Sequence, residues 1–251
     1  LGPCTIGKNC WIGPNVVIGT PAEDFSTLDQ FNNSDPNIWN LKQGFGIFIG
    51  DNVIIREHVA IHQGVARKTT INDNVFLMHG SHVGHDVYID KNVTISPLTA
   101  IGGYCKIFEN ANLGMSSVIH QKLNIGAYSM IGMNSTVTKN INPFELYYGS
   151  PAKKHGLNIR LMKKMNYSDS QIENLISYYE ENKNIPDFVV KYINQTDGIK
   201  QFIINNLIVI ENNKFKISSY DNLICKNKAI KTKEDFRQES EREMMIQLNK
   251  I

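Results

Sequence analysis

The sequence has almost no excess of charge of either sign. It contains 26 basic and 24 acidic residues, which gives a net charge of +2 at pH 7. No basic stripe interleaved with aromatic residues runs along it. Because clustered positive charge is what binds phosphate backbones, we expect no nucleic-acid partner. No apolar run approaches the ~20 residues that a membrane-spanning helix needs, so we also expect no membrane span.

Cysteine is scarce, and its spacing argues against a disulfide scaffold. The four cysteines, Cys4, Cys10, Cys105 and Cys225, form no CxxC pair. This usage is typical of a reduced, cytoplasmic protein. No signal peptide with a charged and then an apolar part opens the chain. The first residue is Leu1 rather than methionine, so the position of the native start stays open.

What the sequence does contain is an aliphatic residue at every sixth position over a long stretch. A small or β-branched residue follows four positions later in nearly every unit. Six residues form one short strand and one corner, so three units close a triangular coil whose aliphatic side chains stack inside a prism. Asparagine and glycine at the corners relieve backbone strain there. The series is Ile71, Leu77, Val83, Ile89, Ile95, Ile101, Ile107, Leu113, Ile119, Ile125, Ile131 and Val137.

The repeat predicts an all-β fold, a parallel β-helix over residues 1–157, with four full coils in 71–142. Hexapeptide repeats of this kind are known from left-handed helices, an exception to the usual right-handed crossover, so we expect the left-handed form. Two interruptions, at 20–46 and 63–69, predict loops that leave the prism, and such loops are commonly binding elements. The same phase holds upstream at Ile6, Ile12 and Ile18 and again at Ile49, Ile55 and Ile61.

Residues 158–251 are predicted to form a smaller C-terminal region, helical or mixed α/β, that caps the solenoid. Apolar residues at helical spacing predict an amphipathic helix over 168–182, with Ser168 as a candidate N-cap. We predict a hairpin about Asn212–Asn213, and we interpret the charged tail from Lys226 as helical or partly disordered. The apolar residues of the helix are Ile172, Leu175, Ile176 and Tyr179.

Histidine is concentrated in the predicted β-helix, and none of these side chains takes an aliphatic core position. We weigh three interpretations: a solvated surface, a metal site shared between subunits, and general-base catalysis in a cleft between subunits. We favour the third because imidazole exchanges protons near working pH. Asp86 directly follows His85, and a neighbouring carboxylate can fix the imidazole tautomer. The six histidines are His58, His62, His79, His82, His85 and His120.

Several short motifs in this stretch occur together in one known family. From residue 12 to 182 the chain resembles the bacterial UDP-N-acetylglucosamine acyltransferases that open lipid A synthesis. The motifs are IGTPAEDF, IREHVAIHQG, SHVGHD, IGG at 101–103, IHQ at 119–121 and GLNI at 156–159. Since function depends on the site and not on the fold, it is the joint set of motifs that carries the resemblance.

The resemblance implies a catalytic role for three residues. His85 matches the base that takes a proton from the acceptor, Asp86 matches its carboxylate neighbour, and Gly103 matches the residue whose backbone N–H faces the thioester oxyanion. It also implies a homotrimer with a cleft between subunits. An acyl-CoA or an acyl carrier protein would be the acyl donor. We expect no permanently bound cofactor and no metal.

The resemblance further implies a set of substrate-binding residues. Asp24 matches the acidic residue that holds the acceptor group, and His82 and His120 match histidines lining the sugar and donor clefts. Gln121 lies in the same motif as His120 and is grouped with it. Asn158 matches a residue that contacts the nucleotide.

Five residues depart from the family pattern. Glu23 replaces a glutamine, Tyr104 a histidine near the sugar 6-hydroxyl, Arg160 an acidic residue and Lys164 an arginine. Met133 stands at the position that limits acyl length, and its bulk favours a short or medium acyl chain. Together these predict N-acylation of an amino sugar that is carried on dTDP or UDP and used for a surface polysaccharide. One form of this prediction is a 6-deoxy amino sugar.

Three other functions are compatible with the sequence. The first is the family's own reaction, 3-O-acylation of UDP-N-acetylglucosamine for lipid A. The second is a zinc carbonic anhydrase of the same fold, which needs three histidines meeting across a subunit interface and which zinc analysis would reveal. The third is a non-catalytic solenoid scaffold, which would show no affinity for nucleotide sugars.

Overall fold

The computed structural model describes residues 3–24, 44–181, 208–211 and 214–217. The chain forms two compact units, residues 1–168 and residues 169–251. Most of the predicted 20–46 loop and the tail from Lys226 lie outside the described residues.

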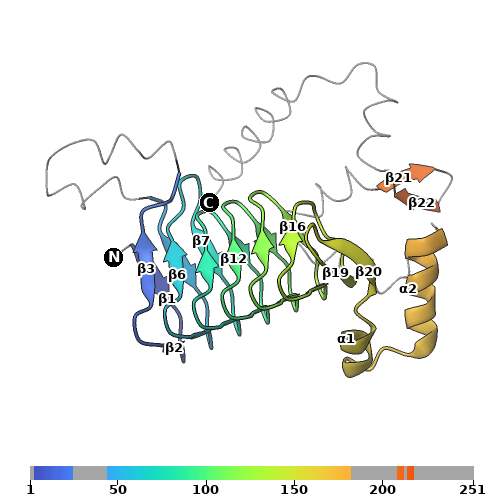
Figure 1. Ribbon diagram of the computed structural model, residues 1–251, viewed down its shortest axis with the longest axis horizontal. Helices are drawn as coiled ribbons and strands as arrows, with labels where there is room; N and C mark the ends of the chain where they lie inside the picture. Colours follow the sequence, from blue (N-terminus) through green and yellow to red (C-terminus); the bar gives the residue numbers. More distant parts are fainter. Residues whose placement is uncertain (1–2, 25–43, 182–207, 212–213, 218–251) are drawn as a thin grey trace, which may run out of the picture. The chain divides into compact units, whose positions relative to one another are not determined.

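Short parallel strands build a prism with three faces, one strand per face in each coil (Figure 1). The first face contains β1 (Cys4–Ile6), β4 (Ile47–Ile49), β7 (Thr69–Ile71), β10 (Tyr88–Ile89), β13 (Lys106–Ile107) and β16 (Asn124–Ile125). The second contains β2 (Trp11–Ile12), β5 (Ile54–Ile55), β8 (Phe76–Leu77), β11 (Thr94–Ile95), β14 (Asn112–Leu113) and β17 (Met130–Ile131). The third contains β3 (Val17–Thr20), β6 (Ala60–His62), β9 (His82–Val83), β12 (Ala100–Ile101), β15 (Val118–Ile119) and β18 (Thr136–Val137). The predicted left-handed parallel β-helix is confirmed.

The aliphatic series forms the core of the prism. On the first face Ile49 pairs with Ile71, Ile71 with Ile89 and Ile89 with Ile107, and these side chains have no exposed surface. Burying each such side chain contributes roughly 1.5–3 kcal/mol before the entropy of ordering is subtracted. The interruptions at 20–46 and 63–69 leave the stacking intact, because the pairing resumes in the same phase after each.

The corners place one residue per hexad in the left-handed backbone region, where a side chain is strained unless it is asparagine or glycine. Asp86 (φ 59°), Tyr104 (φ 64°) and Lys122 (φ 65°) break this preference at a single corner, stacked one coil above another. Backbone N–H groups of Tyr104 and Lys122 donate to the carbonyls of His85 and Gly103, 2.9 and 2.8 Å apart. Asparagine fills seven of the other corners, at Asn9, Asn15, Asn52, Asn74, Asn92, Asn110 and Asn134.

A hairpin and a short helix end the prism. β19 (Glu145–Tyr148) extends the second face, and β20 (Lys153–Leu157) pairs with it antiparallel. Lys154 neutralises the buried Glu145 carboxylate, with 2.9 Å between Nζ and Oε1. α1 (Ile159–Lys164) follows and belongs to the first unit rather than to the C-terminal one.

The second unit contains the predicted helix and the predicted hairpin. α2 (Asp169–Glu181) buries Ile172 and Leu175 as expected, with Tyr178 buried more completely than Tyr179. β21 (Ile208–Glu211) and β22 (Lys214–Ile217) pair antiparallel. Neither described helix has the length and apolar character needed to cross a membrane.

Candidate active site

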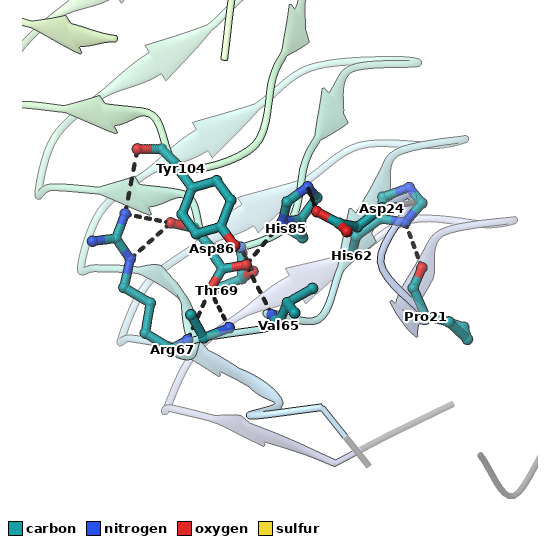
Figure 2. Close-up of polar contacts among 10 residues, drawn as sticks. Pro21, Asp24, His62, Val65, Arg67, Thr69, His85, Asp86 and Tyr104 are labelled. Atoms are coloured by element: carbon teal, nitrogen blue, oxygen red, sulfur yellow. Dashed lines mark hydrogen bonds and ion pairs between the residues drawn. The ribbon is translucent and has the colours of Figure 1, made fainter. Parts of the chain in front are cut away.

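The candidate base lies at the corner between β9 and β10. His85 is 6% exposed and Asp86 is fully buried, and 2.8 Å separates His85 Nδ1 from the Asp86 carboxylate (Figure 2). The carboxylate can only accept, so Nδ1 carries the proton and donates it. In the neutral imidazole Nε2 then has the lone pair and can act as a base.

The short insertion at 63–69 surrounds the Asp86 carboxylate with donors. Backbone N–H groups of Val65, Ala66 and Arg67 donate to its two oxygens at 2.8, 2.8 and 2.7 Å (Figure 2). Burial alone would raise the pKa of Asp86, but the hydrogen bonds from His85 and these three N–H groups outweigh it and lower that pKa. Asp86 therefore stays ionised and holds the tautomer of His85.

Two side chains fasten the insertion to the corner. The Arg67 guanidinium donates to the backbone carbonyl of Asp86 at 2.9 and 2.7 Å and to that of Tyr104 at 3.3 Å. Thr69 Oγ1 accepts from the Asp86 N–H at 2.9 Å. Burial lowers the pKa of Arg67, and the neighbouring Asp86 opposes that shift. The insertion thus supports the site, which the break in the repeat alone did not reveal.

Gly103 lies against the imidazole of His85. A Cβ atom at this position would lie 2.5 Å from Nε2, so any residue larger than glycine would push the imidazole out of its place. The Gly103 N–H has no hydrogen-bond partner among the described residues. The Tyr104 ring meets the His85 ring edge-on, with 5.0 Å between centroids. One unpaired donor and one imidazole nitrogen are therefore neighbours.

The segment after β3 brings carboxylates to the same surface. Asp24 Oδ2 lies 3.8 Å from His85 Nε2 (Figure 2). Glu23 is exposed and lies next to His62 and His82. Burial lowers the pKa of His82, and His62 adds to this shift while Glu23 opposes it. His62 was not assigned a role from the sequence, although it lies in the IREHVAIHQG motif.

Of the predicted residues, Asp24, His85, Asp86, Gly103 and Tyr104 meet at one point, with Glu23 and His82 adjoining. The other six make no described contact with His85. Asn158 caps α1, with its side chain accepting from the Leu161 N–H and donating to the Tyr128 carbonyl at 3.0 Å. The remaining five are exposed: His120, Gln121, Met133, Arg160 and Lys164.

The fold and the site define a hexapeptide-repeat β-helix that carries a buried histidine–aspartate pair at one corner. Two family descriptions match parts of the chain. "Bacterial transferase hexapeptide (six repeats)" matches residues 68–103, and "Hexapeptide repeat of succinyl-transferase" matches residues 3–29.

Relatives of named activity support the resemblance. The chain is 34% identical over 136 residues to an acyl-[acyl-carrier-protein]–UDP-N-acetylglucosamine O-acyltransferase of Burkholderia thailandensis, covering 53% of this chain and 52% of the relative. A protein of the same name from Pseudomonas savastanoi is 32% identical over 137 residues, 53% of each chain. The chain thus spans about half the length of the curated relatives it matches.

A solved structure agrees. The UDP-N-acetylglucosamine acyltransferase of Bacteroides fragilis has a TM-score of 0.63 and 29% identity, over 70% of this chain and 65% of that one. The resemblance to this group of enzymes is confirmed. These relatives are named as O-acyltransferases, whereas the departures from the family pattern predicted N-acylation for this chain.

Proposed function

We propose that the protein is an acyltransferase that moves an acyl group from a thioester to a hydroxyl of a nucleotide sugar of the UDP-N-acetylglucosamine type. The observation that carries this is the orientation of His85. Asp86 holds its Nδ1, and its Nε2 faces Asp24 and Gly103. Relatives 32–34% identical are named for this reaction, with acyl carrier protein as donor.

The reaction follows from this geometry. Nε2 of His85 takes the proton of the acceptor hydroxyl as its oxygen attacks the thioester carbonyl. The carbonyl becomes an oxyanion, to which the Gly103 N–H donates. The tetrahedral intermediate then collapses, the carbon–sulfur bond breaks, and the His85 imidazolium returns its proton to the leaving thiolate. The ionised Asp86 stabilises that imidazolium throughout.

The acceptor contacts the site through Asp24. The Asp24 carboxylate, 3.8 Å from Nε2, accepts a hydrogen bond from a second donor group of the sugar, which leaves the proton of the attacking hydroxyl to Nε2. N-acylation of an amino sugar remains a second candidate, because the exposed Glu23 carboxylate suits an ammonium group. Acceptors of both types belong in the assay. A cytoplasmic location stays a prediction.

We further propose that the protein assembles as a homotrimer with the cleft between subunits. Large apolar side chains stand exposed on the outside of the prism: Leu98 (56%), Met115 (50%), Val118 (48%) and Met133 (71%). Exposed apolar surface of this kind is typical of a protein–protein interface. Identical copies arranged with closed symmetry can bury it against one another. Light scattering on purified protein should give three times the chain mass, and a monomer at micromolar concentration would contradict this.

Replacing His85 tests the reaction. With acyl carrier protein or CoA thioesters and UDP-N-acetylglucosamine, His85→Asn should lower kcat/KM about 10²- to 10⁴-fold, the range for loss of a general base. His79→Asn is the matched control, because His79 contacts Glu57 and not the site. Equal activity of His85→Asn and wild type would remove His85 from the mechanism. If the protein hydrates carbon dioxide and transfers no acyl group, the alternative of a zinc carbonic anhydrase would be favoured.

A further inference from the structure

Beside the base, two histidines and one glutamate form a group that the proposed proton transfer does not use. The nearest ligand atoms of Glu23, His62 and His82 all lie within 4.8 Å of one another. The two imidazole rings lie 4.8 Å apart between centroids, tilted by 47°. His62 ends β6 and His82 begins β9, which are neighbours on the third face. Glu23 reaches them from the segment that follows β3.

The orientation of His62 is fixed by contacts with the end of β3 and the residue that follows it. Its Nδ1 lies 3.0 Å from the Pro21 carbonyl (Figure 2). It also lies 3.1 Å from Thr20 Oγ1. A carbonyl oxygen only accepts, so Nδ1 carries the proton and Nε2 keeps its lone pair. Metal-binding histidines typically donate their second ring N–H in this way, which fixes the tautomer and the ring orientation. His62 is 7% exposed, so the arrangement is part of the fold.

We infer that Glu23, His62 and His82 bind a divalent transition metal such as Zn²⁺. Two imidazole nitrogens and one carboxylate leave the fourth tetrahedral position open, as in catalytic zinc sites. Ligand atoms at about 2.0–2.1 Å from the ion stand roughly 3.4 Å apart. The ligand atoms lie no more than 4.8 Å apart, so any contraction needed is at most about 1.4 Å, and the exposed Glu23 side chain can supply it. This site departs from the sequence-based expectation of no metal.

Metal binding can be measured on the whole protein without acyl donor or acceptor. Protein treated with a chelator is titrated with Zn²⁺ by calorimetry and with Co²⁺ by visible absorption, where four- or five-coordination gives intense d–d bands. We expect one equivalent per chain. Glu23→Gln, His62→Gln and His82→Gln should each weaken Zn²⁺ binding at least about tenfold, since each removes a ligand. Circular dichroism identifies any variant that fails to fold.

The matched control is His79→Gln, which removes a histidine that also contacts a glutamate, Glu57, with 3.4 Å between Nδ1 and Oε1. It should leave Zn²⁺ affinity unchanged. Binding of less than half an equivalent in the wild type would overturn the inference. So would an affinity that Glu23→Gln and His82→Gln leave unchanged, or one that His79→Gln lowers equally. Because no turnover is measured, failure here leaves the proposed acyl transfer standing.

Discussion

Gly103→Ala tests whether the close approach of backbone to imidazole sets the rate. The new Cβ would lie 2.5 Å from His85 Nε2, 2.7 Å from Cε1 and 3.0 Å from Cδ2. Ordinary contacts between such atoms are near 3.5 Å, so the ring must retreat by about 1 Å. The φ of Gly103 is not in the left-handed region, so alanine strains no backbone and the effect is confined to the ring. A misplacement of about 1 Å costs about 10²-fold in rate, or about 2.7 kcal/mol.

The assay follows thiol release from an acyl thioester with UDP-N-acetylglucosamine, and it is made in two backgrounds. If the methyl group acts through the imidazole, Gly103→Ala should lower kcat/KM about 10²-fold in the wild type. It should add little when His85 is already asparagine, because coupled residues are not additive. Wild-type turnover, or the same 10²-fold loss in both backgrounds, would refute the reasoning.

Three further predictions concern stability and specificity. Asp86→Asn should destabilise the protein by about 3 kcal/mol at pH 7. The pKa of Asp86 is lowered in the folded state, so its stabilisation is present above about pH 4 and is lost as the pH falls through the folded pKa. The difference in unfolding free energy between wild type and Asp86→Asn, measured in urea, should therefore become smaller in acid. A difference that stays constant from pH 7 to pH 3 would contradict this. Ser117→Ala should raise stability by about 1 kcal/mol in thermal unfolding, since its buried Oγ has no partner among the described residues, and a clear loss counts against it. Met133→Gly should shift donor preference to longer chains by roughly fourfold per added methylene, whereas an unchanged chain-length profile would separate Met133 from the acyl site.

The fold was predictable because every six-residue unit of the repeat carries the same structural signal. One aliphatic residue in six sets the strand, the corner and the pairing partner together, so Ile71 and Ile89 pair where the phase requires. The C-terminal hairpin was predictable from a local signal, two asparagines between apolar runs. Tyr178 is buried more than Tyr179, so the buried stripe of α2 follows Ile172, Leu175 and Tyr178.

The site was predictable only in part. The sequence motifs identified His85 and Asp86 as candidate site residues. The donors that surround Asp86, however, are backbone N–H groups of residues 65–67. Any residue type except proline supplies such a donor, so the only sign of it in the sequence is the interruption of the repeat. Asn158 caps the start of α1, a role that the sequence did not predict, and its contact with the nucleotide stays a prediction.

The insertion at 63–69 makes the ionised aspartate depend on a neighbouring coil. If this segment opens while the prism stays folded, Asp86 loses three donors at once and the imidazole loses its fixed partner. Catalytic competence would then have a lower melting point than the solenoid that carries it. The amide protons of residues 65–67 are natural reporters of that event, because their exchange with solvent requires the release of this one carboxylate.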